Sequence, residues 1–142
     1  MAGLRGPDAR FHQQADQATK AGEDFARLFY DTLEKRRHLL GNFFLDTANL
    51  VWNGNPYCTK EAIGRFYESL PACQTDVICA DAQPFRGEFV QGQTAIHVVV
   101  AGQIKFSGKR WVPYTESFVL TAQDNVWKIA VDTFRFQEPA PM

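Results

Sequence analysis

The stretch VWKIAVDTFRFQ, residues 126–137, stands near the C-terminal end of the chain and is rich in β-branched and aromatic residues, which predicts a strand. Successive side chains of a strand point to opposite faces of its sheet. One face would carry Ala130, Asp132, Phe134 and Phe136. The other would carry Trp127, Ile129, Val131, Thr133 and Arg135. Neither set is mostly polar, so we expect both faces of this strand to be covered.

A second strand, from about Thr94 to Phe106, has the same two-faced character. Its first face is uniformly apolar and carries Ile96, Val98, Val100, Ile104 and Phe106. Its second face is mixed and carries His97, Val99, Ala101, Gln103 and Lys105. A chain of 142 residues has too few helices to cover both faces of a sheet. We therefore expect the second face to pack against another molecule.

The remaining segments predict two helices followed by a run of strands. Apolar residues recur at helical spacing from about Gln14 to Arg37 and again in TKEAIGRFYESLP, residues 59–71. In the second helix Thr59 supplies the N-cap and Pro71 marks the end. An apolar turn, LLGNFFLD (39–46), a strand, ANLVW (48–52), and a turn, NGN (53–55), lie between the helices.

Two further strands, at about 75–84 and 114–123, complete the sheet. Short connections after Phe106 and Gln123 predict an antiparallel meander. The order of the elements indicates an α+β fold with the helices packed on one face of a bent antiparallel sheet. We expect one domain over residues 14–138, a flexible N-terminal tail over 1–13 and a short C-terminal tail over 139–142.

Composition argues against several classes of function. The net charge of −1 lacks the basic excess of a nucleic-acid-binding protein, and no apolar run approaches the roughly 18 residues of a membrane-spanning helix. The basic run EKRRH (34–38) suits the negative end of the first helix better than a nucleic-acid patch. The cysteines Cys58, Cys73 and Cys79 form no CxxC pair, so we expect reduced, buried thiols.

Candidate catalytic groups are few. The histidines, His12, His38 and His97, have no metal-binding spacing, and no nucleotide-binding or nucleophile motif occurs, so we expect neither a cofactor nor a metal. Asp132 lies on the expected core face, where Tyr30 from the long helix could meet it. Such an acid and phenol could abstract a proton next to a carbonyl. The favoured alternative is a buried carboxyl held by hydrogen bonds.

Six ordered motifs carry a family resemblance: EKRRHLLGNFFLDTANLVWNGN (34–55), FYESLP (66–71), DAQP (81–84), GQIKF (102–106), FVLTAQ (118–123) and VWKIAVDTFRFQE (126–138). In content and order they resemble the nuclear transport factor 2 (NTF2)-like superfamily, and above all its NTF2-related export (Nxt) proteins, over about residues 15–138. The resemblance implies a cone-shaped fold, with a long curved sheet wrapped around the helices and dimerisation through the outer sheet face.

The resemblance to the export proteins implies that this chain is a non-enzymatic adaptor. Such a chain heterodimerises with the NTF2-like domain of an Nxf/Tap-type receptor and supports mRNA export through nuclear pores, shuttling between nucleus and cytoplasm. Position in the family puts Val99, Thr133 and Arg135 at the interface, with Arg135 pairing with an acidic group of the receptor. The expected alternation of the two strands adds Ala101, Ile129 and Val131 to the partner-binding set.

The alternative is a homodimeric import factor for Ran in its GDP form. That relative uses an acidic residue just after the strand tryptophan, where this chain has Asn53. It also uses acids in the hairpin that follows GQIK, where this chain has the basic segment Phe106–Arg110. Ran binding is therefore not expected. It also uses an early helix tryptophan for Phe-Gly nucleoporin repeats, and QQADQATKA (13–21) has none, so nucleoporin contact is expected only through the heterodimer.

A third possibility is an enzyme of the cone fold, which would need an open cavity reaching Asp132. Bulky aromatic residues are expected to fill much of that space instead: Phe25, Phe29, Phe66, Trp127 and Phe134. We expect no direct nucleic-acid or membrane contact.

Overall fold

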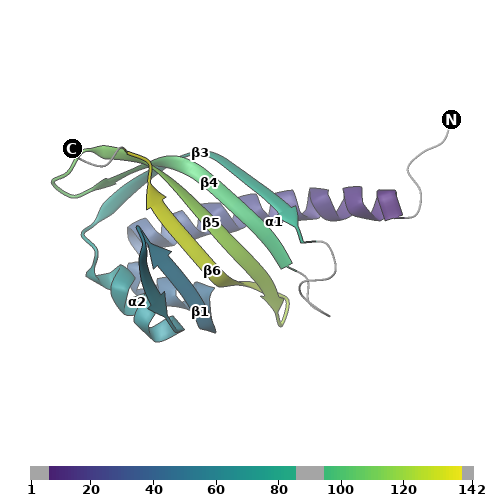
Figure 1. The fold of residues 1–142 in the computed structure, drawn as a ribbon, viewed down its shortest axis with the longest axis horizontal. Coiled ribbons are helices and arrows are strands. Elements are labelled where there is room, and N and C mark those ends of the chain that lie inside the picture. The colour runs from purple at the N-terminus through teal and green to yellow at the C-terminus, as the bar shows by residue number, and fades with distance from the viewer. Residues whose placement is uncertain (1–6, 86–94, 139–142) are drawn as a thin grey trace.

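The computed structural model describes residues 7–85 and 95–138, which form two α-helices, one 3-10 helix and a six-stranded sheet. The elements in chain order are α1 (Pro7–Lys35), η1 (Arg37–Phe43), β1 (Phe44–Trp52), β2 (Asn55–Cys58), α2 (Lys60–Ser69), β3 (Cys73–Pro84), β4 (Ala95–Phe106), β5 (Trp111–Gln123) and β6 (Val126–Phe136). In Figure 1 the curved sheet lies in front of the long α1, and α2 lies beside β1 at one end. The predicted α+β fold is confirmed.

The sheet has the strand order β2-β1-β6-β5-β4-β3. Strands β3 to β6 form the predicted antiparallel meander. The prediction of a wholly antiparallel sheet is wrong, because β1 pairs parallel with β6, where Leu50 lies opposite Asp132. No hairpin joins these two strands, so no turn signal in the sequence fixes their relative direction. The short strand β2 was not predicted.

Helix α1 begins at Pro7, earlier than the predicted start near Gln14. Residues 7–13, expected in a tail, belong to this helix, while the expected tail residues 1–6 and 139–142 lie outside the described chain. The helix packs on the concave side of the sheet. At Gly22 a Cβ atom would stand 2.3 Å from the Cβ of Ala82, so only glycine lets α1 approach β3 this closely.

Aromatic rings fill the space between α1 and the sheet. Phe25, Phe29 and Phe134 are buried as predicted, whereas Phe66 and Trp127 are only partly buried. The ring of Phe134 stacks on Trp52 with centroids 3.9 Å apart and planes 6° apart. Such ring pairs add about 0.5–1.5 kcal/mol beyond their buried area. We call the side of the sheet that faces these rings the inner face, and the opposite side the outer face.

A β-bulge at Ala130 reverses the alternation of side chains along β6. Val131 pairs with Val119, but the next paired residue, Ile129, faces Leu120. One extra residue in β6 therefore sends Ile129 to the inner face, where it is fully buried. The prediction that Ile129 shares the outer face with Val131 is wrong, because regular alternation does not foresee a bulge.

Strands β3 and β4 approach each other closely at Gly102 of β4, beside a second bulge, at Ile78. A substitution of Gly102 tests this close approach. A Cβ atom on Gly102 would stand 2.4 Å from the carbonyl oxygen of Asp76, a backbone atom that cannot move without shifting β3. We expect Gly102→Ala to lower the free energy of unfolding by about 1–3 kcal/mol, measured by urea denaturation. Gly64→Ala, on α2 where the nearest atom is 3.7 Å away, is the matched control and should be neutral or stabilising. Equal stability of both variants would contradict this packing.

Candidate functional site

The outer face is the first candidate site. It presents side chains from four neighbouring strands in register. They are Val51 on β1, Val131, Thr133 and Arg135 on β6, Thr115, Ser117 and Val119 on β5, and His97, Val99 and Ala101 on β4. One row across the strands runs Val99, Ser117, Thr133, Val51. The outer face is thus a continuous surface built from every second residue of four strands.

Exposed valines mark the centre of the outer face. Val99 retains 39% and Val131 38% of their accessible surface, and Val119 lies between them on β5. Exposed valines among small polar side chains on an open sheet face are typical of a protein–protein interface. Five of the six predicted partner-binding residues share this face: Val99, Ala101, Val131, Thr133 and Arg135.

Arg135 is exposed and lies opposite Thr115. Its neighbours Phe134 and Phe136 point to the inner face, where Phe134 is buried and Phe136 is half-buried. Within residues 7–85 and 95–138, no carboxylate lies within ion-pair distance of the Arg135 guanidinium. Its charge is therefore available to a group outside the described chain.

Sequence reasoning missed the contribution of β1 and β5 to the outer face. Val51, Thr115, Ser117 and Val119 were not singled out, although the hairpin between β5 and β6 fixes their positions beside Thr133 and Arg135. The signal was present in the meander, since the strand that precedes a tight hairpin presents its alternate residues beside those of the next strand.

A pair of buried carboxyl groups is the second candidate site. Glu116 on β5 is 2% exposed and Asp132 on β6 is 0% exposed, both on the inner face. The hydroxyl of Tyr30 donates to Oε1 of Glu116 at 2.9 Å, and the hydroxyl of Tyr67 on α2 donates to Oδ2 of Asp132 at 2.7 Å. Asp132 is thus held by hydrogen bonds, as we favoured, but Tyr67 is its partner in place of Tyr30. Glu116 was missed, although it stands between Tyr114 and Phe118 on one face of YTESF.

Burial raises the pKa of both carboxyl groups. Desolvation raises the pKa of Asp132 to about 6. It raises the pKa of Glu116 well above its usual value, and the nearby negative charge of Asp132 raises it further. Two carboxylates this close cannot both ionise without strong repulsion, so the pair retains a proton at neutral pH.

The acid pair has no contact with the described surface pockets. Pockets of about 620, 500 and 640 Å³ open on the described chain, and neither Glu116 nor Asp132 lines any of them. General acid–base catalysis needs a group within hydrogen-bond reach of the substrate. The geometry is that of a polar element of the core.

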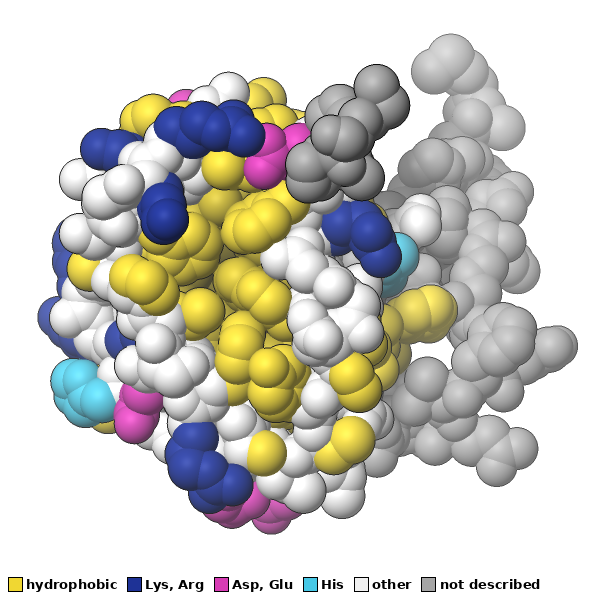
Figure 2. Space-filling model, turned by 60° about the vertical axis from the view of Figure 1, so that its left-hand side comes forward, with side chains coloured by type: hydrophobic (Ala, Val, Ile, Leu, Met, Phe, Trp, Pro, Cys, Tyr) yellow, Lys and Arg dark blue, Asp and Glu magenta, His cyan; other side chains and the backbone are white. Residues whose placement is uncertain are grey.

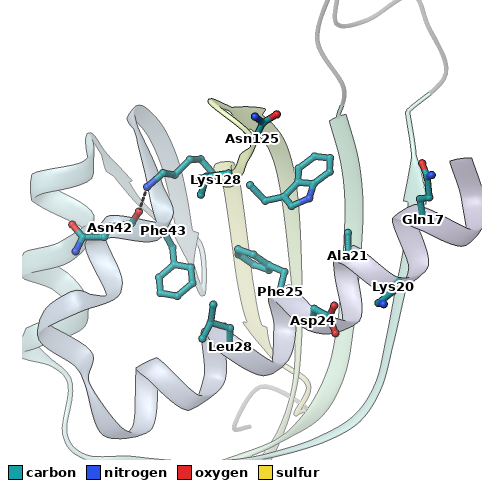
Figure 3. A pocket seen from close by; sticks show the side chains of 12 residues that line it. Gln17, Lys20, Ala21, Asp24, Phe25, Leu28, Asn42, Phe43, Asn125 and Lys128 are labelled. Carbon is teal, nitrogen blue, oxygen red and sulfur yellow. Dashed lines mark hydrogen bonds between the residues drawn. The ribbon is translucent and has the colours of Figure 1, made fainter.

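The 620 Å³ pocket, which we call the helix pocket, lies between α1 and the turn that joins β5 to β6 (Figure 3). Phe25 and Leu28 of α1 face Phe43 and Trp127 across it. Trp127, predicted on the outer face, lies on the inner side because the bulge at Ala130 reverses the alternation. Lys20, Asp24 and Lys128 also line the pocket, so cations and a carboxylate stand together at its edge.

The described chain was also searched for metal-binding groups and for membrane-spanning helices. Within the described chain, His, Cys, Asp and Glu side chains form no group of three or more that could hold a metal ion. None of the described helices has the length and apolarity needed to cross a membrane.

Cys73 is buried, but the prediction of burial is wrong for Cys58 and Cys79, which are exposed on β2 and β3.

The acid pair predicts how stability depends on pH. The unfolded chain releases the Asp132 proton near pH 4, whereas the folded chain holds it to about pH 6, so the folded state binds more protons and stability falls as the pH rises through this window. Glu116, with its raised pKa, extends the fall to higher pH. Glu116→Gln keeps the shape but cannot ionise.

We therefore expect the free energy of unfolding of Glu116→Gln to fall less than that of the natural chain between pH 5 and pH 8. Urea denaturation at the two pH values measures the difference. Glu61→Gln, an exposed change on α2, serves as the control and should follow the natural chain. A Glu116→Gln protein with the natural pH slope would show that the acid pair carries no shifted proton.

Comparison with known proteins gives the family. The family model of the nuclear transport factor 2 (NTF2) domain matches residues 21–136. The NTF2-related export protein 2 of Mus musculus is 42% identical over 132 residues, which cover 90% of this chain and 93% of that protein.

Two solved structures share the fold. Nuclear transport factor 2 from Cryptosporidium parvum superposes with a TM-score of 0.73 at 22% identity, over 87% of this chain and 95% of that one. The Chaetomium thermophilum structure of the Mex67 NTF2-like domain complexed with Mtr2 gives a TM-score of 0.70 at 13% identity, over 82% and 96%. The matched family domain, together with 42% identity to an export protein over nine-tenths of the chain, shows that this protein belongs to the NTF2-related export proteins of the nuclear transport factor 2 family.

Proposed function

We propose that this chain is a non-enzymatic adaptor that heterodimerises, through its outer face, with the NTF2-like domain of an Nxf/Tap-type mRNA export receptor. In this role it supports the passage of mRNA through nuclear pores and shuttles between nucleus and cytoplasm. The observation that carries the proposal is the outer face itself, with its exposed valines and an arginine that has no acidic partner in the described chain.

The comparisons support this choice of partner. The similar Mus musculus protein is named for export, and the Chaetomium thermophilum structure pairs an NTF2-like domain of Mex67 with Mtr2. Two sheets can pack face to face, and no described element of this chain covers its outer face. We propose that the interface with the receptor is a sheet-to-sheet contact of this kind.

Apolar burial would supply most of the affinity. Covering the outer face removes the surface of Val99, Val131 and Val119 from water, which is worth roughly 25 cal/mol per Å² of apolar area. A stable interface buries about 800 Å² on each partner, and we place the centre of this one on the four strands of the outer face. Arg135 lies toward one end of β6, where a charge pair selects the partner.

Two other positions, Asn53 and the β4–β5 hairpin, disfavour the Ran-importing homodimer. Asn53, which follows Trp52, is neutral, and its Oδ1 already accepts a hydrogen bond from the backbone N–H of Phe136 at 2.8 Å. The β4–β5 hairpin carries Lys109 and Arg110 in place of acids. A cationic partner would meet repulsion here, so the receptor heterodimer remains the better proposal, with nucleoporin contact reached through the partner subunit.

Charge reversal at Arg135 tests the proposed interface. Arg135→Asp would place two acids against each other, and Arg135→Ala would leave the receptor acid unpaired. We expect binding of the receptor's NTF2-like domain to weaken about 30-fold for Arg135→Ala and further for Arg135→Asp, measured by isothermal titration calorimetry.

Arg65→Asp is the matched control, because Arg65 is an exposed arginine on α2, away from the outer face. It should bind as the natural chain does. If Arg135→Asp kept natural affinity while remaining folded by circular dichroism, the assignment of the outer face would be wrong.

A further inference from the structure

The outer face continues onto β3, the edge strand beside β4, and there it carries an acid. Asp81 of β3 lies opposite Val99 of β4. Its chain neighbours Ala80 and Ala82 are partly buried and pack against the core. Since side chains alternate along a strand, Asp81 points to the outer face, where it is exposed.

Asp81 shares one row of the outer face with Val99, one of the exposed valines at its centre. The row runs across the strands from Asp81 to Val99, Ser117, Thr133 and Val51. Side chains directly opposite each other on neighbouring strands have Cβ atoms about 4.5–5.5 Å apart. A partner that covers Val99 therefore also covers the carboxylate of Asp81.

The carboxylate of Asp81 has no cationic partner among the described residues, since none of their ion pairs involves it. His97, which lies diagonally across from Asp81, is engaged on its other side, with Nε2 2.8 Å from Oγ of Ser117 on β5. The negative charge of Asp81 is therefore available to a group outside the described chain.

An interface that covers this carboxylate has to supply a partner for it. Covering an ionised group removes its water, and a charge left without a partner costs free energy. A cation on the other protein offsets that cost, and proteins that lack the cation are disfavoured. Arg135 makes the opposite demand, so a protein that covers both side chains needs one base and one acid.

The two charges stand apart on the outer face. Arg135 is on β6 and Asp81 is on β3, with β4 and β5 between these strands (Figure 1). Neighbouring strands lie about 4.8 Å apart, so β3 and β6 are separated by roughly 14 Å. A partner rotated by half a turn on the same face would bring its acid to Asp81 and its base to Arg135, and both contacts would repel. Two opposite charges at this spacing thus select one orientation of the partner.

The other charges of the chain give little guidance to a partner. The net charge is −1. Figure 2 shows lysine and arginine side chains standing singly around one side of the molecule, with acidic side chains beside some of them. Attraction between whole surfaces is therefore weak, and single charges at fixed places decide which protein fits.

We propose that Asp81 is a specificity-determining residue of the receptor interface, where it pairs with a lysine or arginine of the receptor's NTF2-like domain. This receptor base lies roughly 14 Å across the interface from the receptor acid that meets Arg135. The inference rests on the proposed heterodimer and adds to it a second charged contact of opposite sign.

Isothermal titration calorimetry of the full chain with the receptor's NTF2-like domain tests this role. We expect Asp81→Asn to bind about 10-fold more weakly than the natural chain and Asp81→Lys more weakly still, because the lysine faces the receptor base. Glu68→Lys is the matched control, since it makes the same change of charge at an exposed position of α2, away from the outer face. It should bind as the natural chain does.

A charge swap on the receptor separates a direct contact from a structural effect of the substitution. A set of receptor-domain variants, each with one outer-face lysine or arginine replaced by aspartate, is titrated with the Asp81→Lys protein. One variant should bind Asp81→Lys about 10-fold more tightly than the natural receptor domain does. If no variant restores binding, the inference is overturned.

Cys79 reports independently whether β3 lies inside the interface. It is an exposed thiol on the same side of β3 as Asp81, opposite Ala101. Receptor binding should slow its alkylation by iodoacetamide, measured on the full chain by peptide mass spectrometry. Unchanged alkylation of Cys79 in the saturated complex would place β3 outside the interface and would overturn the role of Asp81.

The outcomes distinguish this inference from the proposed function. If Arg135→Asp weakens binding while Asp81→Lys binds as the natural chain does, the heterodimer stands and only the role of Asp81 is overturned. If neither change affects binding, or if the natural chain does not bind the receptor domain, the proposed interface fails and this inference fails with it.

Discussion

The helices of this protein pack against the sheet around one side chain, Phe29 of α1. Its ring is fully buried and contacts five other rings at centroid distances of 4.9 to 6.2 Å. Those rings come from α1, η1, α2 and β5, and they belong to Phe25, Tyr30, Phe43, Tyr67 and Phe118. Because both helices and η1 contribute to the inner side, no described element remains to cover the outer face. The open outer face is thus a consequence of how the core is packed.

The same core contains two carboxyl groups that an apolar core would not need. Burying them costs free energy, which the hydroxyls of Tyr30 and Tyr67 offset in part. Each tyrosine comes from a different helix, so the acid pair on β5 and β6 fixes the position of α1 and α2 against the sheet. Hydrogen bonds have directional requirements that apolar contacts lack, and the acid pair therefore selects one packing of the helices.

Sequence reasoning recovered what local signals encode. The meander, the cap at Thr59 and the outer-face positions of Val131, Thr133 and Arg135 follow from turns and alternation close in sequence. It failed where distant segments decide. The parallel pairing of β1 with β6, the bulge at Ala130 and the contact of Tyr67 with Asp132 depend on tertiary packing. The bulge had the largest effect on the candidate site, because it removed Ile129 from the outer face.

The alternation of side chains along β6 explains how one strand can contribute to two separate surfaces. Alternation along β6 sends Phe134 and Phe136 toward the inner face and Arg135 toward the outer face, so neighbouring residues serve different surfaces. The ring of Phe136 lines the pocket of about 640 Å³ beside the β4–β5 hairpin, while Arg135 lies on the opposite side of the same strand. The bulge at Ala130 leaves this division unchanged, because it exchanges the inner and outer positions only in the first half of β6, before Val131. The backbone geometry of one strand therefore determines which side chains meet the core and which remain for partners.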